Sequence, residues 1–349
     1  MNPTAIRNLE GGGARRIGLR RRYNRLRAGG RRMRYVSLFS GIGGFERGIH
    51  KMFPSAVCAG YSEINPHALK VYQHHYPEHK NLGDVRKIKG RTLKRIDLLV
   101  GGPPCQNLSS FLNVGENRIN GKGGLRGSKS KLFYHYIRLL KEIRPRHFIM
   151  ENVASMKHSD RDAIQRCLEK AFKKKVYLAK LNSEHVSAQR RNRYYWTSFP
   201  VAQLKGGGKR ISSILDKKST VSEHKYEYIE STKARMGKIV PQTGRPRWKI
   251  NSWSSTQQSK SIPVTRSWGT GTTQGRMLLD HRFRNRPLRR YGKSGSALIR
   301  HWTPEETERL QTFPTGWTKT IPRTYRYRTL GNAVTCKVVE HILKYLPKK

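Results

Sequence analysis

Short apolar runs alternate with stretches of helical periodicity between Tyr35 and about residue 200. Strands that alternate with helices predict βαβ units, and therefore an α/β fold built on a doubly wound, mostly parallel sheet. The expected strands cover residues 35–39, 57–61, 96–100, 147–150, 176–181 and 194–199, and the expected helices cover about 44–52, 66–75, 132–143 and 160–172. The chain is long enough for this domain plus a smaller one.

The alternation disappears between about residues 200 and 295, where Gly, Ser, Thr, Arg and Trp dominate. This composition predicts a small, irregular, β-rich domain. The alternation resumes near His301, with a helix from Pro304 and a C-terminal helix that is expected to pack back on the sheet. We therefore divide the chain into an arm (1–34), a first catalytic and cofactor-binding part (35–199), the small domain (200–297) and a C-terminal part that completes the catalytic domain (298–349).

The formal net charge of +50 predicts a polyanionic partner, with nucleic acid as the default. Eleven arginines and a single acid, Glu10, lie in residues 1–34, which predicts a disordered basic arm. Translation from Met33, with the arm as a leader, remains an alternative. No apolar run reaches the roughly 18 residues that a membrane span requires. The four cysteines are scattered without zinc spacing, so we expect no disulfide, no structural metal and a reducing compartment.

The sequence Pro103-Pro104-Cys105-Gln106 follows an apolar strand that ends at Gly102. Cysteine packed as a small hydrophobe would lie inside such a strand, whereas Cys105 lies where the strand gives way to a loop. The prolines restrict the backbone on that side. A nucleophile at the carboxyl edge of a parallel sheet is presented in this way.

Three further features have the offsets of a nucleoside pocket. The glycine turn Ser40–Gly44 follows the first strand and opens a helix, where backbone N–H groups can approach a ligand. Glu63 follows the second strand, roughly twenty residues after the glycine turn. In dinucleotide- and nucleoside-binding proteins, an acid at this offset binds the ribose hydroxyls. Asp84 follows in the next segment. The lysine of a phosphate-binding loop is absent, which argues against ATP hydrolysis.

Two polar motifs come next along the chain. Glu151-Asn152-Val153 is expected to end the strand at 147–150, where a buried acid can keep a raised pKa and donate a proton. A helix cap or an ion pair is the alternative. Gln189-Arg190-Arg191-Asn192-Arg193 enters an apolar strand, and its alternate arginines point to one face. They could hold a carbonyl oxygen or a phosphate, or be surface charge.

These motifs, in this order, resemble those of the C5-cytosine-specific DNA methyltransferase family. The resemblance covers about residues 35–200 and 301–346. It comprises Phe39–Gly44, Pro103–Gln106, Glu151–Val153, the pattern Gln189-x-Arg191-x-Arg193, Pro304-Glu305 with Arg309–Pro314, and Gly331–Val334.

The resemblance implies methyl transfer from S-adenosylmethionine to C5 of cytosine in DNA, on a Rossmann-like methyltransferase fold. It implies that Cys105 attacks C6 of the base, that Glu151 assists at N3, and that Arg193, supported by Arg191, holds the O2 side. Asn152 would fix the backbone of the acid motif. The implied cofactor-binding residues are Phe39, Gly41, Ile42, Gly43, Gly44, Glu63, Ile64, Asp84, Val85, Pro104, Asn332 and Val334.

Chemistry at C6 requires that the cytosine leave the base stack. Residues 107–130 lack a periodic apolar pattern and would be a mobile loop that closes over the base, with Lys122, Arg126, Lys129 and Lys131 near phosphates. Residues 200–297 would be the target recognition domain. We expect a monomer that binds double-stranded DNA and does not bind a membrane. The expected location is the cytoplasm if the source is bacterial or phage, and the nucleus if the host is eukaryotic.

Two other functions are compatible with these motifs. A tRNA-modifying branch of the resembled family has the same catalytic residues, and the long insert rich in Trp and Arg argues mildly for DNA instead. A catalytically silent DNA-binding protein on the same fold is the second alternative. The joint presence of Cys105, Glu151 and Arg193 argues against it.

Overall fold

The structure is a computed structural model. It describes residues 32–104, 132–216, 222–227, 238–239, 248–249, 254–255, 261, 277–279 and 294–347. Cys105, the segment 107–130 and the arm before Arg32 lie outside the described residues, so the predictions made for them stay predictions.

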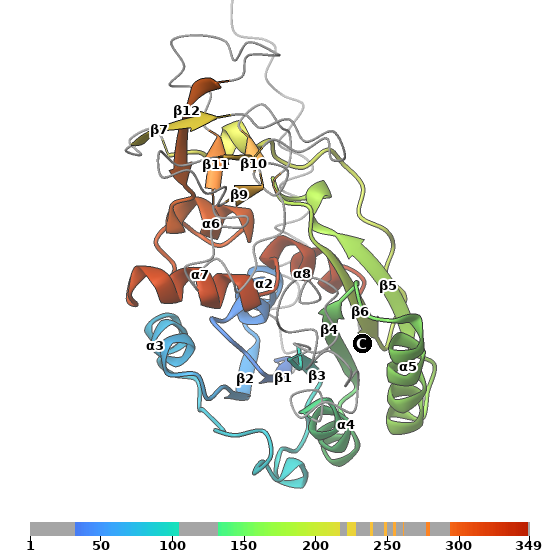
Figure 1. The fold of residues 1–349 in the computed structure, drawn as a ribbon. Coiled ribbons are helices and arrows are strands. Elements are labelled where there is room, and N and C mark those ends of the chain that lie inside the picture. Colours follow the sequence, from blue (N-terminus) through green and yellow to red (C-terminus); the bar gives the residue numbers. More distant parts are fainter. Residues whose placement is uncertain are drawn as a thin grey trace, which may run out of the picture.

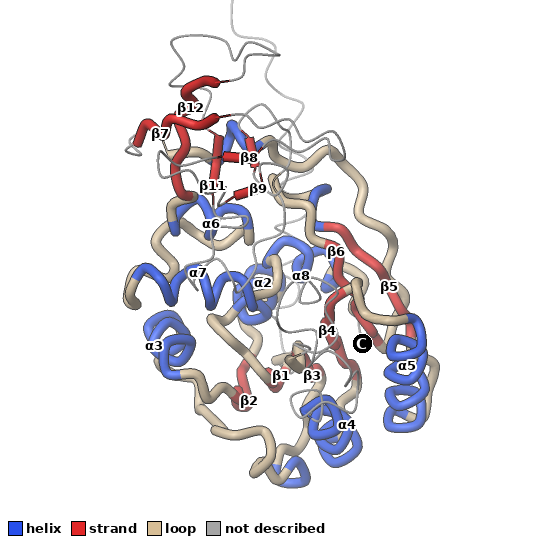
Figure 2. The backbone as a smooth tube through the Cα atoms, in the orientation of Figure 1, coloured by secondary structure: helices blue, strands red, loops and turns tan. Residues whose placement is uncertain are grey.

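A six-stranded sheet forms the centre of the molecule (Figures 1 and 2). Its order is β2-β1-β3-β4-β6-β5, and all strands are parallel except β6, which runs against β4 and β5. The strands are β1 (Arg34–Leu38), β2 (Val57–Ser62), β3 (Leu98–Gly101), β4 (His147–Val153), β5 (Tyr177–Asn182) and β6 (Asn192–Thr197). The mixed α/β, mostly parallel fold predicted from the alternation is therefore confirmed.

Helices cover both faces of this sheet. The helices α2 (Gly44–Met52) and α8 (Cys336–Leu343) pack on one face, and α4 (Leu132–Ile143) and α5 (His158–Phe172) pack on the other. Successive side chains of a strand point to opposite faces. Accordingly, Tyr35 of β1 packs with α2 and α8, whereas Val36 packs with α4.

A third cluster of buried side chains joins α3 (Pro66–His75), α6 (Pro304–Leu310) and α7 (Arg323–Asn332) beside the sheet. The start of α3 follows from the sequence, because the Asn65 side chain accepts hydrogen bonds from the first helical N–H groups and Pro66 follows it. Within the described residues, no helix is both long and apolar enough to cross a membrane.

Most strand boundaries differ from the sequence-based expectation by one to three residues, and one helix was not expected. The first strand ends at Leu38, because Phe39 has a φ of 56° that no strand contains. The strand β4 continues to Val153, so the acid motif lies within the strand and not after it. The helix α7 was not expected, since its sequence has no apolar stripe of helical period.

The region after β6 contains short strands, as its composition predicted. The strands β7 (Ser222–Glu227), β10 (Ser254–Ser255), β11 (Met277–Leu279) and β12 (Ser294–His301) form a four-stranded sheet, and β8 (Lys238–Ile239) pairs with β9 (Trp248–Lys249). Within the described residues, short 3-10 helices lie at η2 (Gly90–Thr92), η6 (Ser183–His185) and η7 (Ile211–Ile214).

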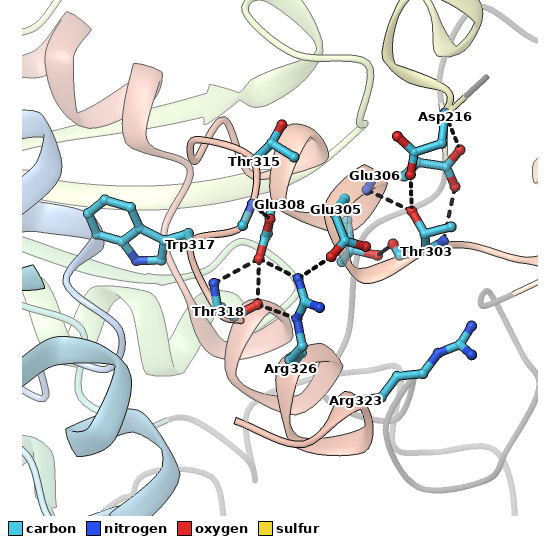
Figure 3. Close-up of polar contacts among 12 residues, drawn as sticks. Asp216, Thr303, Glu305, Glu306, Glu308, Thr315, Trp317, Thr318, Arg323 and Arg326 are labelled. Atoms are coloured by element: carbon cyan, nitrogen blue, oxygen red, sulfur yellow. Dashed lines mark hydrogen bonds and ion pairs between the residues drawn. The ribbon is translucent and has the colours of Figure 1, made fainter. Parts of the chain in front are cut away.

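The chain leaves the described core at Asp216 and returns to it at Thr303. Figure 3 shows these two residues side by side, with the Thr303 hydroxyl donating to Asp216 Oδ2 at 2.7 Å. Arg309 binds the other carboxylate oxygen of Asp216 at 2.7 Å. Thr303 also caps α6 in a reciprocal pair with Glu306. The exit and the return are therefore held together at the start of α6.

Candidate active site

The carboxyl ends of β1, β2, β3 and β4 meet at one edge of the sheet, because these four strands are parallel. The strand order reverses direction between β1 and β3, and ligands of open α/β sheets bind at such a switch point. The turn after β1, Glu63 after β2, Pro104 after β3 and Glu151 near the end of β4 are all brought to this edge. The motifs scattered along the sequence thus share one place in the fold.

The glycine turn after β1 has a backbone that only small residues adopt easily. Gly41 has a φ of 57°, and no atom lies within 4 Å of the place where a Cβ would stand. Gly43 has a φ of 85° and caps α2, and a Cβ there would lie 2.7 Å from Cε2 of Tyr76. The open space at Gly41 allows a ligand to approach the backbone closely.

Glu63 holds the end of β2 against this turn. Its Oε2 accepts a hydrogen bond from Gly41 N at 2.9 Å, and its Oε1 accepts from the N–H groups of Ile64 and Asn65, each at 2.8 Å. The Ile64 side chain is 63% exposed, the largest exposed fraction among the large apolar residues of the described part of the chain. A carboxylate and an exposed apolar surface therefore stand next to each other beside the glycine turn.

Asp84 lies on the loop after β2 and pairs with Arg86, whose Nη2 is 2.5 Å from Asp84 Oδ2. Hydrogen bonds from Arg86 lower the pKa of the Asp84 carboxyl to about 2. The neighbouring Val85 side chain is buried in the core, as is that of Ile42. These two residues could contact a cofactor through their backbones.

The end of β3 lies against Glu151. A Cβ on Gly102 would lie 2.9 Å from Glu151 Oε2, so only glycine fits there without displacing the carboxylate. Asn152 Nδ2 donates to the carbonyl of Pro103 at 3.4 Å, which ties the proline segment to β4. This described stretch ends at Pro104, one residue before Cys105 in the sequence.

Glu151 is paired with Arg193 of the adjacent strand β6. The Arg193 Nε lies 2.9 Å from Glu151 Oε1, and the two side chains are 17% and 13% exposed. Burial raises the pKa of the Glu151 carboxyl, while the charges of Arg193 and Arg191 oppose that rise. Burial is the larger effect, so the pKa of Glu151 lies above its ordinary value.

The other members of the QxRxR pattern bind the C-terminal part of the chain. Arg191 is buried, and its Nη2 donates to the carbonyl oxygens of Gly331 and Ala333 at 3.1 and 2.9 Å. Gln189 donates to the carbonyl of Leu310 at 3.0 Å. The pattern thus combines one residue at the acid, Arg193, with Arg191, which holds the Gly331–Val334 motif, and Gln189, which holds the Arg309–Pro314 motif.

The C-terminal part closes over the glycine turn. A Cβ on Gly44 would lie 2.8 Å from Cγ2 of Val334, so the two residues are in close contact. Asn332, two residues before it, is exposed at the end of α7. Trp317 Nε1 donates to the Ile42 carbonyl at 2.9 Å. The glycine turn and the C-terminal part of the chain, far apart in the sequence, therefore contact each other at this edge of the sheet.

Buried polar contacts hold the segment that carries Trp317. Glu308 accepts from Thr318 N at 2.8 Å, from the Thr318 hydroxyl at 2.5 Å and from Arg326 Nη2 at 2.9 Å (Figure 3). Arg326 also pairs with Glu305 at 2.7 Å. A charged pair at a fully buried carboxylate fixes the register of α6 against α7.

Sequence reasoning missed the contributions of Gly102 and Trp317. The position of Gly102 directly before the prolines was a usable signal, since glycine permits close approach of a neighbouring group. Nothing in the sequence separated Trp317 from the other tryptophans. Within the described residues, no group of three or more His, Cys, Asp or Glu side chains could hold a metal ion.

Comparison with known proteins extends the match beyond single motifs. The family model described as C-5 cytosine-specific DNA methylase matches residues 33–348. The type II methyltransferase M1.ScrFI of Lactococcus lactis subsp. cremoris is 27% identical over 321 residues, which is 88% of this chain and 76% of that protein. The orphan methyltransferase M.Rho11sI of Bacillus phage rho11s is 37% identical over 170 residues, or 47% of this chain. The matched part spans 32% of that phage protein.

Solved structures show the same fold at low sequence identity. The Entamoeba histolytica methyltransferase EhMeth has a TM-score of 0.64 at 19% identity, covering 91% of this chain and 98% of that one. The Dnmt2 methyltransferase of S. pombe has a TM-score of 0.63 at 18% identity, covering 90% and 98%. These similarities concern the architecture as a whole.

Proposed function

The chain belongs to the C-5 cytosine-specific DNA methylase family, and from that premise we propose that it methylates C5 of cytosine in double-stranded DNA. The observation that carries the proposal is the position of Glu151. Its partly desolvated carboxyl pairs with Arg193 and lies against Gly102, three residues before Cys105. An acid, a cation and a cysteine at one sheet edge are what covalent chemistry on a pyrimidine needs.

The proposed methyl donor is S-adenosylmethionine, and the residues at the sheet edge fit it. The uncrowded backbone at Gly41 would receive the methionine end, together with Asn332 and Val334. Glu63 would bind the ribose hydroxyls, and the exposed Ile64 side chain would lie against the adenine. Asp84, Val85 and the turn residues Phe39, Ile42, Gly43 and Gly44 would complete the site, with Pro104 on the side of the reacting base. The donor's sulfonium supplies an electrophilic methyl group, so the reaction needs no metal.

Cys105 is the proposed nucleophile. C5 of cytosine is too weak a nucleophile to take a methyl group, and addition of the Cys105 thiolate to C6 makes C5 enamine-like. Once C5 carries its new substituent, loss of the C5 proton and elimination of the thiolate restore the aromatic ring. The prolines before Cys105 and the bond from Asn152 to Pro103 would restrain the segment that presents the sulfur.

Glu151 is proposed to hold the proton at N3 of the base. Electron density moves from the new C6–S bond through the ring toward N3, and a proton there stabilises the adduct. Burial favours the protonated carboxyl, which can donate, while Arg193 keeps ionisation accessible for the return step. Arg193 would also donate to O2 of the base. Arg191 would act indirectly, through the carbonyls that flank Asn332.

DNA is the proposed substrate because a type II methyltransferase matches most of the chain, and the formal charge of +50 suits a polyanion. Residues 200–297 are proposed to read base edges, with the joined ends at Asp216 and Thr303 as their anchor. A role in restriction–modification, beside a separate nuclease, follows by analogy with that relative.

The test is methyl transfer from labelled S-adenosylmethionine to duplex DNA and, in parallel, to tRNA. We expect label in DNA, at C5 of cytosine on bisulfite sequencing. A covalent adduct with DNA containing 5-fluorocytosine should form at Cys105, because fluorine cannot leave C5 as a proton does.

The Cys105→Ser variant should bind duplex DNA as the parent does and transfer no methyl group. Substantial turnover by that variant would remove Cys105 from the mechanism. Label in tRNA alone would overturn DNA as the substrate. Cofactor binding without any transfer by the parent protein would support the catalytically silent alternative.

A further inference from the structure

The amino ends of the parallel strands form the edge of the sheet opposite the candidate active site. The strands β1, β3, β4 and β5 run in the same direction, so the segments that enter them meet at this edge. Tyr35 pairs with Leu98, and Leu98 pairs with His147, so the first residues of neighbouring strands are level. The entering segments therefore form a row, here called the amino rim.

Basic side chains dominate the amino rim. Its nine basic residues are Arg32, Arg34, Lys94, Arg95, Arg144, Arg146, Lys173, Lys174 and Lys175. All of them except Arg34 are exposed. The one acid of these segments, Asp97, is 8% exposed and accepts a hydrogen bond from Arg34 N at 2.9 Å. The rim is therefore a strongly positive surface with almost no exposed counter-charge of its own.

The backbone that carries these charges is fixed. Arg95, Arg144 and Lys173 each adopt a left-handed conformation, with φ of 58°, 51° and 58°. Arg146 N donates to Ile96 O at 3.2 Å, which joins two of the entering segments. Positive charges on ordered turns bind a polyanion with a smaller entropic cost than charges on a loose segment.

Cations from two different entering segments act on the imidazole of His147. His147 has a lowered pKa, first because it is partly buried and then because Arg146 and Lys174 lie close to it. Lys174 precedes β5 and Arg146 precedes β4, so the positive field spans the rim from strand to strand.

The opposite edge of the sheet carries acids and their paired cations. Glu63 lies there, as do Asp84 with Arg86 and Glu151 with Arg193. The seven residues of β4 separate the two edges by roughly 23 Å. That distance exceeds the Debye length of about 10 Å at 0.1 M salt, so the two edges act independently on an ionic ligand.

We propose that the amino rim is a second binding surface, which holds the phosphate backbone of duplex DNA without reading its sequence. The rim crosses the sheet from β1 to β5, four strand spacings or about 19 Å. A duplex laid along it presents one phosphate charge per ~1.7 Å of axis, enough to face every rim cation. The inference goes beyond the proposed function and does not require methylation.

Two consequences follow for how the chain meets DNA. A duplex engaged at Glu151 cannot reach the rim, so the rim takes a second duplex or a distant part of the same molecule. The described chain begins on this edge at Arg32, and the sequence before it is rich in arginine.

The test uses the full chain and a cytosine-free dA·dT duplex of about 20 base pairs, which the catalytic site cannot use. The rim variant is Lys94→Gln/Arg144→Asn/Arg146→Gln/Lys174→Gln, with Asn at position 144 because Asn tolerates a left-handed backbone. The control is Lys70→Gln/Lys80→Gln/Lys180→Gln/Lys319→Gln, which removes the same charge from exposed sites outside the rim.

We expect the slope of log affinity against log salt to fall by about 3 in the rim variant, since each lost phosphate contact reduces it by ~0.9. Affinity at low salt should fall at least tenfold more than in the control. The kcat on a short cytosine-containing duplex at saturation should stay at the parent value. Equal losses in the two variants would overturn the proposal.

Two additional measurements keep the result interpretable. The parent chain should bridge an immobilised duplex to a labelled second duplex. The rim variant should lose this bridging, and the control variant should keep it. Vesicles of anionic phospholipid test the other polyanion, and a rim-dependent loss seen with vesicles and not with DNA would also overturn the proposal. If the fourfold variant unfolds, the single reversal Lys174→Glu gives the same test with a smaller slope change.

Discussion

Arg193 Nε lies 2.9 Å from Oε1 of Glu151, across the antiparallel pair β6 and β4. The strand that runs against its neighbours thereby delivers a cation to the acid at the edge where the parallel strands end. The pair influences the charge state of an acid that lies directly against Gly102, in the segment that leads to Cys105.

Removal of the cation should shift the pH dependence of the reaction. In Arg193→Gln, the pKa of Glu151 should rise further, because burial still favours the protonated form and the nearest opposing charge is lost. If the protonated carboxyl is the active form, the alkaline limb of the pH profile moves to higher pH. Carboxyl NMR of labelled Glu151 measures the pKa itself.

Arg190→Gln is the matched control for that shift. Arg190 precedes the same strand, is exposed, and pairs with Glu184 at 3.0 Å. It should leave both the pH profile and the Glu151 signal unchanged. An unshifted signal in Arg193→Gln would contradict the electrostatic role assigned to the pair.

Gly102 should tolerate no side chain. In Gly102→Ala, the new Cβ would stand 2.9 Å from Glu151 Oε2 and push the carboxylate away, so kcat should fall at least tenfold while DNA binding persists. Gly207→Ala is the control, since nothing lies within 4 Å of its Cβ position. Steady-state kinetics on both variants compare the two sites, and equal kcat values would reject the steric argument.

Trp317 should support cofactor binding through the glycine turn. In the structure, the rings of Trp317 and His75 stack with their centroids 3.5 Å apart. Trp317→Phe removes the N–H that donates to the Ile42 carbonyl and keeps an aromatic ring to stack on His75. We expect a several-fold weaker affinity for S-adenosylmethionine and a loss of about 1 kcal/mol in unfolding free energy. Calorimetry with the cofactor checks the affinity. An unchanged dissociation constant would separate Trp317 from the site.

Glu46 should make stability depend on pH. It is fully buried in α2, and Tyr72 donates to it at 3.1 Å. Burial raises its pKa from 4.5 to about 7, so the folded chain keeps a proton that the unfolded chain loses. Stability contributed by this group is therefore lost as pH rises from about 4.5 to 7. Between pH 5 and 8, Glu46→Gln should gain on the order of 2–3 kcal/mol relative to the parent. Denaturant unfolding at both pH values would show a constant difference if Glu46 were not involved.

The sequence predicted most of the central architecture. The apolar run before Gly102 and the periodic stretch 132–143 are local patterns, and local patterns determine where strands and helices form. The helix at 66–75 was found at its observed bounds because Asn65 and Pro66 mark its start chemically. The extension of β4 to Val153 was not predictable locally, since pairing with β6 maintains it.

The candidate site was less accessible from the sequence. Order along the chain showed that Glu63, Glu151 and Arg193 belong together, but not which atoms meet. The division of labour between Arg193 and Arg191 depends on carbonyls some 140 residues away in the chain, which no local pattern encodes. Trp317 is a similar case, because its partner lies 275 positions earlier.

The packing of α8 on α2 has a consequence for synthesis. A Cβ on Gly48 would lie 2.6 Å from Cγ1 of Val339, so the last helix fits closely on the first one described. In a chain still being synthesised, the apolar side of α2 and β1 has no cover until α8 has left the ribosome, and the glycine turn lacks Val334 as its outer wall. We therefore expect the proposed methyl-donor site to form only after α8 has been made.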